Sequence, residues 1–68
     1  MNYFEWSQEY TDTANELEKV VGRLKSERQH ACESKKQELA EKIIMYRALR
    51  NECLKTAALL MDRHRGVA

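Results

Sequence analysis

The chain has 68 residues, of which 34% are charged, with a net charge of +1, no proline, two glycines and two cysteines. A chain of this size makes one small domain, and its balanced charge provides no overall field that would attract nucleic acid or an anionic membrane. No stretch approaches the roughly 18 consecutive apolar residues of a membrane-spanning helix. Scarce glycine and frequent Ala, Glu, Lys, Leu and Arg are typical of an all-α, coiled-coil-like protein.

The first predicted helix covers about residues 3–32. Asn2 is a good N-cap residue, and Glu5 lies three residues later, where a capping-box carboxylate belongs. Mostly apolar residues then alternate at intervals of three and four, the a and d pattern of a heptad repeat. These positions are Tyr3, Trp6, Tyr10, Thr13, Leu17, Val20, Leu24, Glu27 and Ala31.

The heptad frame does not continue beyond Ala31, because it would bring Glu38, Glu41 and Glu52 into the apolar seam. A second frame fits the later residues Leu39, Ile43, Tyr46, Cys53, Ala57 and Leu60. The break predicts two helices that fold against each other as an antiparallel two-helix hairpin. The alternative is one continuous helix that pairs with a second chain.

The nearly all-polar segment between the two frames predicts a turn at about residues 33–35. Ser34 followed by Gln37 matches a capping box, so the second helix is expected to cover about residues 35–64. Gly66 then suits the position just after the helix end. Equal helix lengths support the hairpin.

A hairpin that turns near Ser34 pairs residues whose numbers add up to about 67. In that register Trp6 meets Leu60, and Leu24 meets Ile43. The acidic start of the first helix would lie beside the basic end of the second helix. We expect this register to hold to about one helical turn.

The two cysteines are not expected to form a disulfide. Cys32 lies beside the turn, whereas Cys53 lies opposite Ala14, far beyond the distance that a disulfide spans. Reduced thiols, together with an N-terminus that lacks the basic and apolar regions of a signal peptide, predict a cytoplasmic location.

More apolar surface is present than one seam between two helices can bury. Such excess surface usually marks an interaction site. The candidate interface residues are Tyr3, Phe4, Trp6, Ile44, Leu49, Leu59 and Met61. We therefore expect a homodimer in which two hairpins form a four-helix bundle, or binding to another helical protein. A simpler reading makes Trp6 and Tyr10 ordinary core residues, which still leaves Phe4 and Leu59 uncovered.

The sequence holds no catalytic or phosphate-binding motif. His30, Cys32 and Glu33 come nearest to a set of metal ligands, but a zinc site needs four ligands, and His64 lies far along the rod. Cys53 has no facing histidine that could activate it as a nucleophile. We expect no enzymatic activity, no cofactor and no bound metal.

Nucleic-acid binding is the main alternative function. Cations occur on both predicted helices, at Lys19, Arg23, Lys25, Arg28, Lys42, Arg47, Arg50, Lys55, Arg63 and Arg65. They are interleaved with glutamates, which is typical of a solvated helix surface rather than a phosphate-binding stripe. Arg50 falls on the seam, where it could pair with Glu16, pair with a second subunit, or indicate an error in register.

The run Tyr3-Phe4-x-Trp6-Ser7-x-Glu9-Tyr10, with Asn51-Glu52-Cys53-Leu54-x-Thr56-Ala57 near the end, resembles short helical proteins of clostridial-type bacteria. The resemblance covers most of the chain and implies a bacterial origin, but it implies no function. From the residues themselves we expect a non-enzymatic protein-interaction or adaptor module. The alternative is a nucleic-acid-associated regulatory protein that uses a basic face of the dimer.

Overall fold

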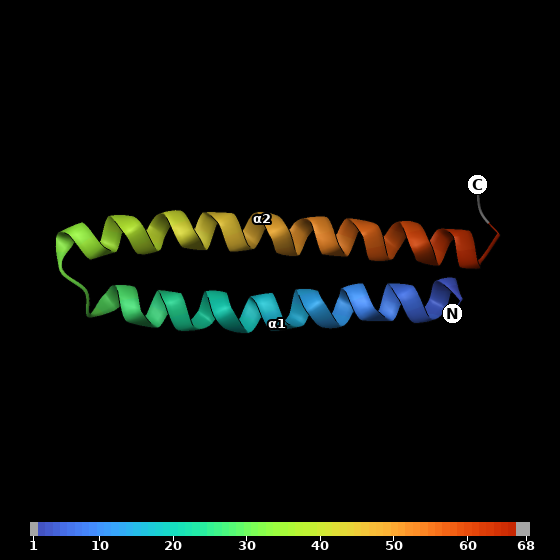
Figure 1. Ribbon diagram of the computed structural model, residues 1–68, viewed down its shortest axis with the longest axis horizontal. Helices are drawn as coiled ribbons and strands as arrows, with labels where there is room; N and C mark the ends of the chain where they lie inside the picture. The colour runs from blue at the N-terminus through green and yellow to red at the C-terminus, as the bar shows by residue number, and fades with distance from the viewer. Residues whose placement is uncertain (1, 67–68) are drawn as a thin grey trace.

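The computed structural model describes residues 2–66 and contains two helices, α1 (Tyr3–Gln29) and α2 (Glu33–His64). The helices run antiparallel, so the N-terminus of α1 and the C-terminal end of α2 lie at the same end of the molecule (Figure 1). The molecule is a rod of 51 × 17 × 13 Å. This arrangement confirms the predicted all-α hairpin and excludes one continuous helix. Neither described helix is long and apolar enough to cross a membrane.

The start of α1 is capped as predicted. Asn2 has an extended backbone, and its side-chain Oδ1 accepts a hydrogen bond from the Glu5 backbone N–H at 2.8 Å. This bond satisfies one of the backbone donors that the first turn of a helix leaves without a partner. The end of α2 also matches the prediction, because Gly66 follows the last turn with φ +77°, a conformation that favours glycine.

The turn between the helices lies about three residues earlier than expected. Helix α1 ends at Gln29, and α2 already begins at Glu33, with Cys32 as its N-cap residue. The predicted turn at residues 33–35 and the predicted N-cap at Ser34 are therefore wrong. Cys32 has the extended backbone of an N-cap residue, and its carbonyl accepts the first helical hydrogen bond from the Lys36 N–H at 2.9 Å. Cysteine is not among the usual N-cap residues, so the residue types around the turn did not indicate that Cys32 would cap α2.

The buried stripe of α1 is rotated from the predicted a and d positions. Ser7, Ala14 and Val21, each seven residues from the next, are the buried residues of this helix. Trp6 and Thr13, which were expected on the seam, are exposed. Small side chains let two helix backbones approach closely, whereas an indole in the same layer would hold them apart. With these small residues turned towards α2, Tyr3, Trp6 and Tyr10 are exposed on one flank of the hairpin.

The stripe of α2 follows the predicted frame. Leu39, Ile43, Ala57 and Leu60 are buried, and two further positions of the frame, Tyr46 and Cys53, are half-buried. A strict three–four spacing therefore predicts the contact surface of this helix correctly.

Two contacts between the helices establish the register. Glu18 forms an ion pair with Arg50, and the Phe4 and His64 rings lie 5.8 Å apart. Both contacts agree with the predicted register to within one residue. Arg50 does not pair with Glu16, which instead binds Lys19 on its own helix at 3.2 Å. The expected ion pair is therefore made with Glu18, which lies two residues further along α1.

Candidate interaction surface

The core of the hairpin is small. The buried apolar residues are Ala14, Val21, Leu39, Ile43, Ala57 and Leu60. A larger group of large apolar side chains stays exposed on the described part of the chain, namely Tyr3, Phe4, Trp6, Tyr10, Ile44, Met45, Leu49, Leu54 and Leu59. Large apolar side chains that gather on one exposed surface often mark an interaction site.

The exposed apolar residues lie on two opposite sides, or flanks, of the hairpin. Residues of α1 and α2 that border the same hollow lie on the same flank. On one flank Trp6 and Arg63 border the same hollow, as do Glu27 and Lys42 nearer the turn. Leu49 lies seven residues from Lys42, so it belongs to this flank as well. We call this surface the aromatic face. Met45 and Leu59 follow Glu38, which borders the hollow near the turn, by seven and 21 residues, so they lie on this side of α2. The exposed apolar residues of the aromatic face are therefore Tyr3, Trp6 and Tyr10 from α1, and Met45, Leu49 and Leu59 from α2.

The contacts between Glu18 and Arg50 and between Phe4 and His64 lie on the other flank, which we call the opposite face. Leu54 follows Arg50 by four residues, about one helical turn, and is exposed on this face. The apolar residues of the opposite face are Phe4, Ile44, Leu54 and Met61.

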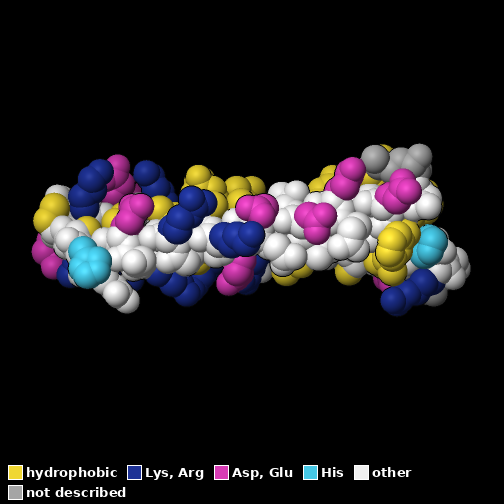
Figure 2. Space-filling model, turned by 90° about the horizontal axis from the view of Figure 1, so that it is seen from below, with side chains coloured by type: hydrophobic (Ala, Val, Ile, Leu, Met, Phe, Trp, Pro, Cys, Tyr) yellow, Lys and Arg dark blue, Asp and Glu magenta, His cyan; other side chains and the backbone are white. Residues whose placement is uncertain are grey.

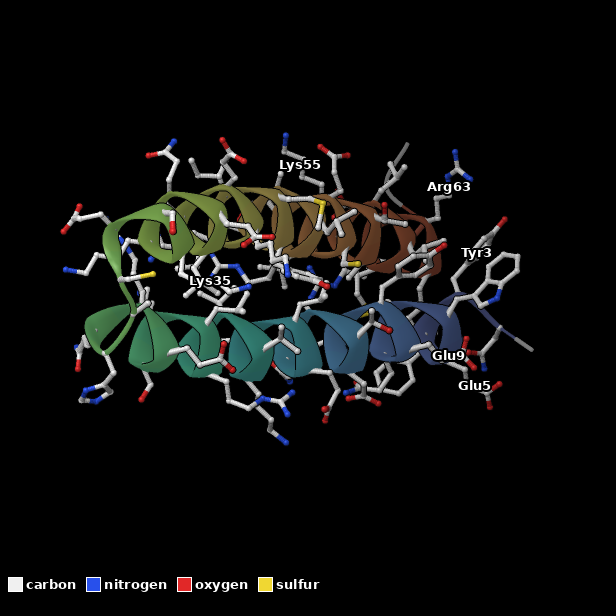
Figure 3. All side chains as sticks on the ribbon, turned by 60° about the vertical axis from the view of Figure 1, so that its left-hand side comes forward. Tyr3, Glu5, Glu9, Lys35, Lys55 and Arg63 are labelled. Carbon is white, nitrogen blue, oxygen red and sulfur yellow. The ribbon has the colours of Figure 1, made fainter. Side chains whose placement is uncertain are left out.

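The aromatic residues of the aromatic face are concentrated at the open end of the hairpin. The Tyr3 and Trp6 rings pack in a tilted arrangement with centroids 6.3 Å apart. A hollow of about 450 Å³ lies between them and the end of α2, bordered by Asn2, Arg63 and His64. Tyr3 and Arg63 project together from this end, whereas Glu5 and Glu9 lie on the outer side of α1 (Figure 3). Tryptophan, tyrosine and arginine are the side chains that contribute most to protein interfaces.

The structure thus separates the predicted interface residues into two groups. Tyr3, Trp6, Leu49 and Leu59 share the aromatic face. Phe4, Ile44 and Met61 lie on the opposite face, where Met61 is half-buried and Ile44 is the most exposed, at 68%. Tyr10 and Met45, which were not among the candidate interface residues, are also exposed on the aromatic face. Tyr10 follows Trp6 by four residues, so both lie on the same side of the helix. The heptad frame, however, assigned both of them to the seam between the helices.

The ion pair between Glu18 and Arg50 is the only one that joins the two helices among residues 2–66. A hydrogen bond from Arg50, together with the positive charges of Arg50, Lys25 and Arg47, lowers the pKa of Glu18 below its ordinary 4.5. A lowered pKa means that the folded chain favours the carboxylate. The pair therefore stabilises the fold above pH 4.5, and this contribution is lost as the pH falls through the lowered pKa.

Cys32 is an exposed thiol in the turn. Its Sγ lies 3.4 Å from the Ser34 Oγ. Hydrogen bonds from Ser34 and from the backbone N–H of Lys35 lower the pKa of this thiol below 9.0, because they favour the thiolate. Cys53, by contrast, is half-buried on the seam of α2.

We expect iodoacetamide to modify Cys32 faster than Cys53 at neutral pH, because the thiolate is the nucleophile and Cys32 is open to solvent. The alkylation rate of Cys32 should reach half its maximum below pH 9.0. Ser34→Ala removes the strongest stabilising hydrogen bond and should move this midpoint upwards. Mass spectrometry of the modified peptides across a pH series measures both effects. An unchanged midpoint in Ser34→Ala would show that the hydroxyl does not act on the thiol.

Within the described part of the chain, no three His, Cys, Asp or Glu side chains gather in a way that could hold a metal ion. Comparisons of the chain with protein-family models, with curated proteins and with solved structures found no match. The resemblance to proteins of clostridial-type bacteria therefore stays a prediction.

Proposed function

We propose that the hairpin is a non-enzymatic interaction module that associates with a second copy of itself through the aromatic face. The two hairpins would form a four-helix bundle with two-fold symmetry, which could serve as an adaptor for further partners. The observation that carries the proposal is the exposure of Trp6 (46%), Leu49 (46%) and Leu59 (52%) on one flank of the rod. In a two-fold dimer each of these side chains would be covered by the same face of the other copy.

The accessible surface of the hairpin supports an interface of ordinary size. The chain exposes 5202 Å², whereas a monomeric protein of 8.0 kDa is expected to expose about 4450 Å² from the usual scaling with mass. The excess of about 750 Å² is close to the roughly 800 Å² that each partner buries in a standard protein interface. Association with a second copy of the chain would bury an area of about this size.

The charges beside the aromatic face are compatible with a second copy. The hollow near the turn is bordered by Glu27 and Glu38 as well as by Lys35 and Lys42. At the open end, Glu9 borders one hollow on this flank and Arg63 borders another. Since both signs alternate along the edges, two such faces can meet without bringing a block of like charges together.

Sedimentation equilibrium at micromolar concentration tests the proposal. We expect twice the chain mass of 8.0 kDa for the native protein. Leu49→Glu should convert the dimer to monomer, because it would bury a carboxylate in the interface. Leu54→Glu is a matched control, since Leu54 is equally exposed on the same helix but lies on the opposite face. A fully helical native monomer, or equal effects of the two variants, would contradict the proposed interface.

A further inference from the structure

A basic hollow lies between the helices near the turn, away from the aromatic face. It has a volume of about 370 Å³ and is bordered by Lys25, Arg28 and Gln29 of α1 and by Lys36 of α2. No carboxylate is among these bordering residues. Lys and Arg side chains are also more frequent in the half of the rod nearer the turn on the side shown in Figure 2.

Two of these cations occupy positions that would normally belong to the core. Arg28 follows the buried Val21 by seven residues, and Lys36 precedes the buried Ile43 by seven. A heptad interval returns to the same side of a helix, so both residues continue the contact stripes of their helices. Near the turn the two stripes therefore bring the exposed Arg28 and the half-buried Lys36 to the edge of the same hollow.

The fold leaves these cations largely without partners. Lys36 is half-buried, and its Nζ lies 3.6 Å from Glu33, a carboxylate whose side chain is 94% exposed. Within residues 2–66, neither Lys25 nor Arg28 has a carboxylate within ion-pair distance. Glu33 and, at longer range, Glu18 offset only part of this positive charge. An anion between the cations would lower the free energy of the folded state further.

We propose that the basic hollow binds an oxyanion of the phosphate type. Lys25, Arg28 and Lys36 would donate charge-assisted hydrogen bonds to its oxygen atoms, and the Gln29 amide would add a neutral donor. A phosphate group carries several oxygen atoms, so it can accept hydrogen bonds from donors on both helices at once. The planar guanidinium of Arg28 can bind two of those oxygens. The anion would link α1 to α2 next to the turn. The same phosphate chemistry could come from free pyrophosphate or from the backbone of a nucleic acid.

Calorimetric titration with inorganic pyrophosphate, at an ionic strength matched with sodium chloride, tests the site. Arg28→Gln and Lys25→Gln should each raise Kd about fivefold, the size expected for one exposed charge pair. Lys55→Gln removes the same charge from the outer side of α2, where Lys55 already lies 3.7 Å from Glu52, and should leave Kd unchanged.

A parallel titration with a short DNA duplex identifies the source of the phosphate group. Much tighter binding of the duplex would indicate a nucleic-acid backbone, and similar binding would indicate free phosphate.

Thermal unfolding gives a second measurement that does not depend on affinity. In chloride alone, Arg28→Gln should unfold at the same temperature as the native chain or higher, because it relieves the repulsion between cations. Pyrophosphate should raise the unfolding temperature of the native chain more than that of the variant. The proposal is overturned if neither anion binds, or if Arg28→Gln and Lys55→Gln affect binding equally. Both variants lie away from the aromatic face, so they should sediment as the native protein does.

Discussion

Trp6→Ala is expected to lower the free energy of unfolding of the assembled protein by about 3–5 kcal/mol, the range for truncation of a large buried side chain. In the isolated hairpin the indole is only half covered, so an effect of this size requires the second copy to bury the rest. Phe4→Ala is the matched control. Phe4 is as exposed as Trp6 (46% each), but it lies on the opposite face, where its ring is beside that of His64. Its loss should cost about 1 kcal/mol, as is common for single substitutions.

Urea unfolding followed by circular dichroism, at two protein concentrations, measures this difference. If folding is coupled to dimer formation, the midpoint for the native chain rises with protein concentration. That dependence should weaken in Trp6→Ala and persist in Phe4→Ala. A loss below about 1 kcal/mol for Trp6→Ala would show that this indole is not buried in the assembly.

Ala14→Leu is expected to destabilise the hairpin by about 1–3 kcal/mol, because the larger side chain must enter a close-packed layer between the helices. Ala14 is 1% exposed and lies on the rotated stripe of α1 with Ser7 and Val21. Ala14 is not one of the a and d positions of the predicted heptad frame, so the predicted packing would leave more room for a leucine at this position. The substitution therefore distinguishes the observed packing from the predicted one.

Asn15→Leu provides the comparison for Ala14→Leu, since Asn15 is the next residue and is exposed. It should change the free energy of unfolding by no more than about 0.5 kcal/mol, as most surface substitutions do. Chemical unfolding at one fixed protein concentration is sufficient for both variants. Equal stability of the two would show that the helices do not meet at Ala14.

Local patterns in the sequence were enough to predict the helices and their pairing. The absence of proline, the frame break after Ala31 and the cap at Asn2 depend on backbone chemistry and on periodicity, which act within a few residues. The same patterns predicted the register to within a turn, since a hairpin with a short connection can pair its residues in few ways. They misplaced the turn because Cys32 caps α2, a role for which cysteine has little intrinsic preference.

The candidate surfaces could be predicted only in part. The excess of apolar residues was visible in the composition of the two helices, but their division between two flanks was not. The basic hollow was also missed, because Lys25 and Arg28 lie on one helix and Lys36 on the other. Three cations that are scattered along a sequence look like ordinary solvated residues until the register brings them together.

The sequence by itself determined that this chain forms two amphipathic helices and that they fold back on each other. Only the tertiary structure decided which side of α1 faces α2. That choice depends on how closely two backbones can approach, which is a property of both helices together. Ser7, Ala14 and Val21 allow close packing, so the helix turns these residues inwards and leaves Trp6 exposed. The aromatic face is the consequence of that rotation, and no pattern within one helix could have predicted it.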